Sequence, residues 1–253
     1  MSALKDAFFW VLGFASRLKD RGVILMYHSV TDHQDRFYAV SSKTFADQMR
    51  YLKERVHSVI RLTNLVERIS RKENLRGALA ITFDDGYRDN YSEAFPILKK
   101  YGFPATIFVV TDRIGTEGYL SSEEICDMQS SGLIDIQPHT KTHPELTEIS
   151  EEAVREEMRG SRLAIDALLG KSSRLFAYPY GKHNRRTCEI ARESGFGAAV
   201  GVEEGTVGLS SDLFRLPRVS IDSSTTFTQF RGKISRAVDR YEAVKRIWKR
   251  KSA

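Results

Sequence analysis

The 253-residue chain is 41% hydrophobic and 28% charged, which is ordinary for a soluble globular protein and long enough to bury the core of one large α/β domain. No apolar run approaches the roughly 20 residues that span a bilayer, and Cys126 and Cys188, without a CxxC spacing, indicate neither a disulfide framework nor a thiolate zinc site. The net charge of +6 is concentrated in residues 231–253, which carry +7, so the neutral remainder gives no general polyanion surface and predicts no nucleic-acid partner.

The N-terminal segment, residues 1–21, is expected to form an amphipathic helix, because its apolar residues recur at helical spacing between Leu4 and Leu18. Its apolar run over residues 8–15 has about the length of a signal core. Asp6 precedes that run, however, and the residues after it make a poor cleavage site. We therefore expect the segment to be retained in the mature protein.

Strands and helices alternate six or seven times through the rest of the chain, with no sequence repeat and no low-complexity linker. This alternation predicts one βα-barrel or one open α/β sheet, here taken as a single domain over residues 22–226. Strands or extended segments are expected at residues 23–27, 58–62, 78–83, 105–110, 133–136, 174–178, 197–202 and 214–221. Helices are expected at residues 45–56, 65–69, 91–101, 121–132, 150–169, 184–194 and 227–253.

Asp84 and Asp85 directly follow a buried apolar strand and precede Gly86. Two adjacent carboxylates are costly to desolvate unless a cation or hydrogen-bond donors receive them, which indicates a metal site or an acid/base pair. The alternative is an Asp-Asp-Gly turn on the surface.

Polar residues also follow three other predicted strands: His28, the segment 139–143, and the segment Pro179-Tyr180-Gly181. In a βα-barrel every strand ends on the same face, where barrel enzymes place their sites. The four clusters would therefore converge, which favours a functional site over a set of surface turns.

His139 and His143 have the i, i+4 spacing of a metal-binding helix, but Pro138 and Pro144 bracket them and favour a tight loop. Such a loop can still direct both imidazoles at one ion, although histidine pairs at this spacing also occur by chance. Together with Asp85 they would form a carboxylate and two-imidazole site. That ligand set suits zinc, with cobalt, nickel or iron as alternatives, and disfavours calcium and magnesium.

The segments 82–86 (Thr-Phe-Asp-Asp-Gly), 139–143 (His-Thr-Lys-Thr-His) and 178–181 (Tyr-Pro-Tyr-Gly), in this order, resemble the polysaccharide deacetylase family, the carbohydrate esterases with a NodB-like domain. The resemblance covers about residues 22–222. It implies a distorted (β/α)7-type barrel and an enzyme that hydrolyses N-acetyl, sometimes O-acetyl, groups on sugars.

The resemblance further implies a role for each matching residue. Asp84 is the general base, and Asp85, His139 and His143 hold a divalent metal that polarises the acetyl carbonyl and lowers the pKa of water. Pro179, Tyr180 and Gly181 contact the substrate, and the backbone N–H of Tyr180 donates to the oxyanion.

The sequence departs from the family pattern at the general acid, because it lacks the late Leu-x-x-His motif and its last histidine is His183. Met26-Tyr27-His28 instead resembles the subgroup that acts on poly-N-acetylglucosamine-type polymers, in which an N-terminal histidine takes this role. We therefore expect His28 to be the general acid, with His183 as the other candidate. A core histidine that caps the strand is the structural alternative for His28.

A second departure concerns the arginine that often orients the base, because Ala177 stands at its place. Arg218 resembles the arginine that the same subgroup carries on its last strand and could reach Asp84; the alternative is a surface arginine at the barrel rim. Arg88 and Asp89 are expected to begin the next helix.

Residues 227–253 predict a basic amphipathic helix that either lies on an anionic membrane or packs on the barrel. Without a recognised export signal, the expected location is cytoplasmic, with peripheral attachment to the inner face of the membrane. The predicted substrate is an N-acetylated sugar of a polysaccharide or lipid-linked glycan. The alternatives are a deformylase or O-deacetylase acting on a lipid-linked aminosugar, and a catalytically dead carbohydrate-binding domain.

Overall fold

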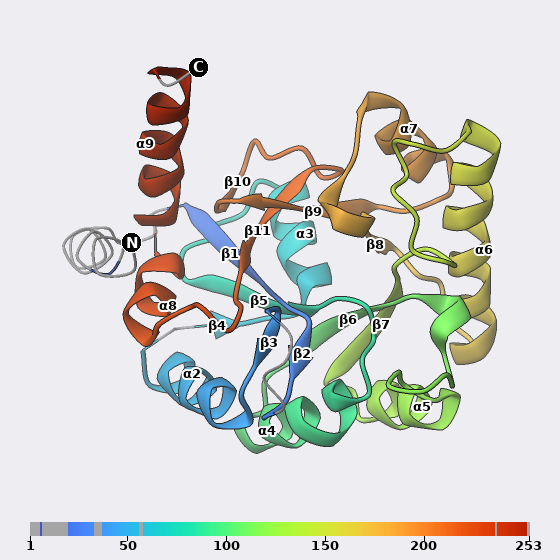
Figure 1. Ribbon diagram of the computed structural model, residues 1–253, viewed down its shortest axis with the longest axis horizontal. Coiled ribbons are helices and arrows are strands. Elements are labelled where there is room, and N and C mark those ends of the chain that lie inside the picture. Colours follow the sequence, from blue (N-terminus) through green and yellow to red (C-terminus); the bar gives the residue numbers. More distant parts are fainter. Residues whose placement is uncertain (1–5, 7–19, 33–36, 56–57, 236, 252–253) are drawn as a thin grey trace.

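Seven parallel strands form a nearly closed barrel in the computed structural model, which describes residues 6, 20–32, 37–55, 58–235 and 237–251 (Figure 1). Neighbouring strands in the barrel pair in parallel throughout. In spatial order the strands are β7 (Ile134–Pro138), β6 (Ala105–Val109), β5 (Ala78–Phe83), β1 (Arg21–Tyr27), β11 (Leu216–Ser220), β9 (Ala198–Glu204) and β8 (Leu175–Ala177). The predicted (β/α)7-type barrel is confirmed.

Four short strands extend this sheet or lie beside it. β4 (Ser58–Val59) pairs with β5, and β10 (Val207–Gly208) pairs antiparallel with the start of β1. β2 (Ser29–Val30) and β3 (Ala39–Val40) form a separate parallel pair in the segment that follows β1.

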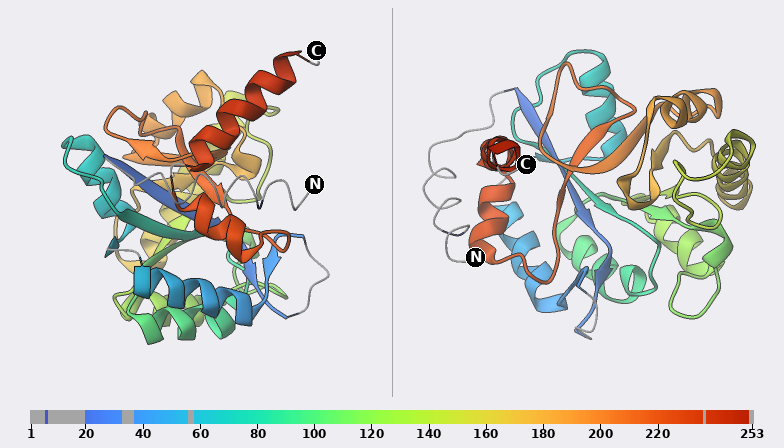
Figure 2. Two further views of the ribbon diagram at one scale, coloured as in Figure 1. Left: turned by 90° about the vertical axis from the view of Figure 1, so that its left-hand side faces the viewer. Right: turned by 45° about the horizontal axis from the view of Figure 1, so that its top comes forward.

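Helices cover the outside of the barrel, as the two further views show (Figure 2). The α-helices are α2 (Ser42–Arg55), α3 (Leu62–Ser70), α4 (Phe95–Tyr101), α5 (Ser122–Ser130), α6 (Glu151–Leu169), α7 (Arg185–Glu193), α8 (Phe227–Lys233) and α9 (Ala237–Lys251). Single turns are the π-helical η1 (Asn90–Ala94) and the 3-10 helices η2 (Thr111–Arg113) and η3 (Pro179–Gly181). The helix expected at residues 91–101 is therefore a π-helical turn followed by α4.

The barrel strands are buried on both faces, which explains their continuous apolar sequences. All six residues of β5 are buried. Its Leu79, Ile81 and Phe83 pack in one apolar cluster, and Ala78 and Ala80 pack in another. Thr82 is the only polar residue of β5, and the carboxylates Asp84 and Asp85 come directly after the carboxyl end of this strand.

Side chains bridge the seam between β7 and β8, the two ends of the strand order, which do not pair with each other. Gln137 Oε1 accepts hydrogen bonds from the backbone N–H groups of Arg174 (3.1 Å) and Leu175 (3.0 Å). Just beyond β7, His139 Nδ1 lies 2.7 Å from the carbonyl oxygen of Ala177. These two side chains take the place of a backbone ladder and bring the loops after β7 and β8 together.

The basic C-terminal segment is two helices, α8 and α9, rather than the single helix expected over residues 227–253. Ser235 explains the break: its hydroxyl donates to the Gly232 carbonyl (2.6 Å) and accepts from the Ala237 N–H (3.2 Å), so it competes with the helical backbone bonds. The expected N-terminal helix lies outside the described residues apart from Asp6, Asp20 and Arg21. Within the described part of the chain, no helix combines the length and apolar character needed to cross a membrane.

Candidate active site

Asp84 is fixed by a buried arginine from the opposite end of the sequence. It directly follows β5 and is 2% exposed, while Arg218, on β11, is fully buried. The guanidinium donates two parallel hydrogen bonds, Nη1 to Oδ1 (2.7 Å) and Nη2 to Oδ2 (2.6 Å). Its Nε donates to the carbonyl of Gly201 (2.7 Å), which fixes the plane of the fork. The predicted reach of Arg218 to Asp84 is confirmed, and the surface alternative is wrong.

The pKa of Asp84 reflects two opposing effects. Burial raises this pKa, but the charge and the hydrogen bonds of Arg218 lower it by a larger amount, so that the pKa falls to about 2. Asp84 is therefore an ionised carboxylate at neutral pH, held in one orientation and able to accept a proton through its remaining lone pairs.

Asp85, His139 and His143 form a compact group whose candidate ligand atoms all lie within 4.8 Å of one another. Asp85 Oδ1 is 3.6 Å from His139 Nε2 and 3.3 Å from His143 Nε2. The segment from His139 to His143 is a loop, as the flanking prolines predicted.

The chemistry of these three donors fits a divalent metal. The contact between His139 Nδ1 and the Ala177 carbonyl places the proton on Nδ1, so the Nε2 lone pair faces Asp85 and His143. Burial, and then the neighbouring His139, lower the pKa of His143 to about 4, so its imidazole is neutral at pH 7. One carboxylate and two imidazoles suit zinc and the other transition ions predicted above.

Backbone strain is concentrated around this group. Six non-glycine residues in the described ranges have positive φ, and four of them lie in the loops of the site: Asp85 (72°), Thr140 (66°), His143 (68°) and Tyr180 (56°). Such conformations persist only where the surrounding structure enforces them, and they cluster at functional sites.

The predicted substrate-binding turn, Pro179-Tyr180-Gly181, forms η3 next to His143. The Tyr180 ring is 59% exposed, and its centroid lies 4.6 Å from that of His143. A Cβ on Gly181, where φ is +66°, would lie 2.3 Å from a Val202 methyl, so only glycine fits. Close packing on β9 thus holds Tyr180 at the rim of the metal-binding group.

The two candidate general acids have different surroundings. The His28 ring is 5.5 Å from that of Tyr38, and burial lowers its pKa while the charges of Asp84 and Asp85 partly counteract this effect. His183 instead stacks on Tyr178, at 5.1 Å between centroids. Its Nδ1 lies 2.9 Å from the Gly181 carbonyl, and its Nε2 lies 3.5 Å from Glu203. His28 is therefore the histidine that the carboxylates of the site influence.

The sequence interpretation missed how the segment after Asp85 holds the His28 segment. Asp89 was expected only to begin a helix, but it accepts hydrogen bonds from Ser29 Oγ (2.5 Å) and Val30 N (3.1 Å). Asn90, fully buried, donates from its amide to the His28 carbonyl (2.8 Å). Two adjacent polar residues at a helix start were the signal, but nothing local indicates their distant partners.

Aromatic rings beside the site were missed as well. Tyr87 stacks on Tyr38 (5.6 Å between centroids) and on Tyr119 (5.2 Å), and its hydroxyl donates to that of Tyr38 (3.0 Å). This row connects the loops after β1, β5 and β6 and supports the Tyr38 ring against His28.

A parallel βα-barrel with a carboxylate held by arginine and a carboxylate–imidazole group at its strand ends has the architecture of a barrel hydrolase. The polysaccharide deacetylase family model matches residues 71–199. The Bacillus subtilis protein YxkH is 32% identical over 209 residues, covering 82% of this chain and 74% of its own length. The poly-beta-1,6-N-acetyl-D-glucosamine N-deacetylase of Staphylococcus aureus is 26% identical, covering 78% of this chain and 72% of that protein.

Among solved structures, the Streptococcus pyogenes deacetylase PplD in complex with acetate has a TM-score of 0.80 at 26% identity, with 85% of this chain and 98% of that chain covered. The chain belongs to the polysaccharide deacetylase family. The enzyme class predicted from the sequence, a hydrolytic deacetylase, is confirmed.

Proposed function

We propose that this chain removes N-acetyl groups from N-acetylated sugars of a polysaccharide or lipid-linked glycan, with a divalent metal, most suitably zinc, held by Asp85, His139 and His143. The observation that carries the proposal is the arginine-held, ionised Asp84 next to this group of candidate ligands. The Staphylococcus aureus relative, a poly-beta-1,6-N-acetyl-D-glucosamine N-deacetylase, supports an N-acetylated sugar as the substrate.

A divalent ion in this site would act as a Lewis acid toward the acetyl carbonyl and increase the acidity of water. Asp84 accepts the proton of the attacking water as the new C–O bond forms. The backbone N–H of Tyr180, at the start of the single turn η3, donates to the developing oxyanion.

Breaking the C–N bond requires a proton on the leaving amine, and His28 supplies it. The products are acetate and the free amine of the sugar. Arg218 keeps the Asp84 carboxylate oriented toward the reacting water, while Asp89 and Asn90 hold the segment that carries His28.

The test is acetate release from N-acetylglucosamine oligomers by the purified chain with added zinc or cobalt, beside Asp84→Asn. We expect release by the wild type and at least about a hundredfold loss in the variant, the usual scale for a positioned base. A protein that binds one metal but releases no acetate would contradict N-deacetylation and direct the assay to formyl and O-acetyl substrates.

A further inference from the structure

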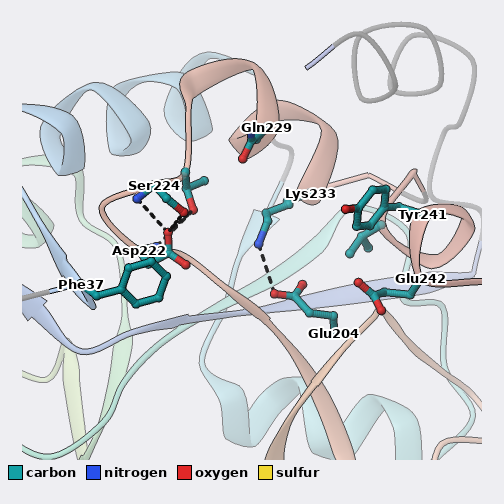
Figure 3. Close-up of a pocket in the computed structure, with 10 residues that line it drawn as sticks. Phe37, Glu204, Asp222, Ser224, Gln229, Lys233, Tyr241 and Glu242 are labelled. Carbon is teal, nitrogen blue, oxygen red and sulfur yellow. Dashed lines mark hydrogen bonds and ion pairs between the residues drawn. The ribbon is translucent and has the colours of Figure 1, made fainter. Parts of the chain in front are cut away.

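A second cavity, of about 210 Å³, lies between α8, α9, the end of β9 and the segment after β11 (Figure 3). Its lining includes Phe37, Glu204, Asp222, Gln229 and Lys233. All but Phe37 lie beyond residues 71–199, the part that the family model matches. The chemistry of this cavity therefore comes from the C-terminal part of this chain.

Polar groups in the cavity lack part of their hydrogen bonding. Glu204 Oε1 accepts from Lys233 Nζ and from Ser220 N, each at 3.1 Å, but the buried Oε2 has no partner among the described residues. Gln229 is 6% exposed, and no described residue forms a hydrogen bond with its side-chain amide. A buried polar group without a partner costs about 1–3 kcal/mol, so Glu204 Oε2 indicates a donor that the described residues do not supply.

Asp222, half-buried, adds a second carboxylate to the cavity. Its Oδ1 accepts from Ser224 N (2.9 Å), Ser224 Oγ (2.7 Å) and Thr225 Oγ1 (3.1 Å). Its Oδ2 receives no hydrogen bond from the described residues. In Figure 3 Lys233 extends from α8 to Glu204, to which a dashed line joins it, and Gln229 lies on the same helix at the edge of the cavity.

The donors and acceptors of the cavity define the class of ligand. Glu204, Asp222 and Glu242 supply three carboxylates against the single ammonium of Lys233, which disfavours an anion and favours a cation. The planar carboxylate and amide groups can each bind neighbouring hydroxyls of a pyranose. Phe37, 69% exposed at the rim, offers an aromatic face to the C–H groups of such a ring.

The cavity lies beside the proposed active site. Glu204 is the register partner of Arg218 across β9 and β11, and Arg218 holds Asp84. On the other side, Phe37 directly precedes Tyr38, whose ring contacts His28. A glycan whose acetylated unit occupies the active site therefore has a second place to bind along the same rim.

We propose that this cavity is a second sugar-binding site for a glucosamine unit, the cationic deacetylated form of the sugar, on the same glycan strand. The inference rests on the proposed function, because it takes its ligand from the product of that reaction. It predicts that the enzyme favours partly deacetylated chains over fully acetylated ones.

The test is calorimetric binding of a fully deacetylated β-1,6-glucosamine pentamer and of its N-acetylated counterpart to the full chain. We expect the deacetylated pentamer to bind about tenfold more tightly to the wild type, and Glu204→Gln, which removes the charge at constant shape, to abolish this preference. Phe37→Ala, at a 69% exposed position, should weaken binding of the deacetylated pentamer several-fold. Leu163→Ala, at a 64% exposed apolar position on α6, is the matched control and should bind as the wild type does.

Equal affinities of the wild type, Glu204→Gln and Phe37→Ala for the deacetylated pentamer would overturn the inference, even if the wild type releases acetate. Preferential binding that depends on Glu204, in a protein that releases no acetate, would support the cavity and contradict the proposed function instead.

Discussion

The pair of Asp84 and Arg218 shows how one residue's charge depends on another that is distant in sequence. Their side chains are 3% and 0% exposed, so each has lost its hydration and relies on the other. Two short parallel hydrogen bonds replace the lost water. Breaking such a pair from one side costs more than removing both charges, because an uncompensated charge then stays buried.

Arg218→Met should therefore destabilise the chain by about 3–5 kcal/mol, the usual cost of leaving one buried charge unpaired. The double variant Arg218→Met/Asp84→Asn should recover part of that loss, because it leaves no unpaired charge. Urea unfolding of the metal-free proteins measures both values. If the free energy of unfolding lost in the double variant equalled the sum of the two single losses, the two charges would not depend on each other.

The two candidate acids can be separated by the leaving group. If His28 protonates the amine, His28→Ala should lower kcat on an N-acetylated oligomer at least about a hundredfold. It should have a far smaller effect on 4-nitrophenyl acetate, because nitrophenolate leaves without a proton.

His183→Ala is the matched control and should stay within a few-fold of wild type on both substrates, because its ring nitrogens face Gly181 and Glu203. If His28→Ala lowered kcat equally on the amide and on the ester, His28 would have a structural role instead.

At the scale of elements, the π-helical turn η1 connects two functional segments. Asp89 directly precedes this turn and Asn90 begins it, and both bind the backbone around β2, the strand that follows His28. π-Helical turns often occur at functional sites, where they reorient side chains without ending the helix. Here the turn ties the segment carrying the proposed base to the segment carrying the proposed acid.

Asn90→Leu should accordingly lower kcat on the oligomer about tenfold while the KM for the substrate changes little, because the position of His28 is affected and not the binding surface. Asn90→Asp, which keeps the size of the side chain but loses the amide donor, should show a similar loss. Asp127→Ala is a suitable control, since that residue contacts the neighbouring Tyr91 and not the His28 segment. An unchanged kcat in both Asn90 variants would show that Asn90 does not position His28.

Short sequence patterns predicted the elements and site residues whose conformation depends on neighbouring residues in the chain. The strand before Asp84, the loop from His139 to His143 and the turn at Tyr180 all follow from apolar runs and flanking glycine or proline. The break before α9 was missed, because apolar spacing continues past Ser235 and only its hydroxyl competes with the helix. The bonds of Asp89 and Asn90 were missed because their partners lie about 60 residues away.

At the scale of the whole molecule, we expect the membrane contact predicted for the C-terminal segment to involve α9 more than α8. Phe230 of α8 is buried, with its ring 6.3 Å from that of Tyr51 on α2, whereas Phe227, 5.5 Å from the same ring, is 44% exposed. At the start of α9, Ala237 and Val238 are buried. Figure 1 shows the rest of α9 extending away from the barrel.

If α9 binds an anionic surface, Lys249→Glu/Arg250→Glu should clearly reduce pelleting of the full chain with phosphatidylglycerol vesicles, because each basic residue near such a surface contributes about 1 kcal/mol. Arg50→Glu/Arg55→Glu on α2 changes the net charge by the same amount and is the control for net charge, and vesicles of phosphatidylcholine are the control for composition. Equal pelleting of the double variant and the wild type would exclude α9 as the contact.

The seam between β7 and β8 has a consequence for local opening of the barrel. His139 is a candidate metal ligand and also bridges this seam, so an ion that fixes its ring would resist separation of the two strands. Removing the metal with a chelator should then accelerate amide hydrogen exchange at Arg174 and Leu175, whose N–H groups donate to Gln137. Exchange at Ile24 and Leu25 should stay slow, because β1 pairs with a strand on each side. The bound ion would then act as a cross-link between the ends of β7 and β8. Equal acceleration of exchange in both regions would show that the ion stabilises the whole fold and not the seam in particular.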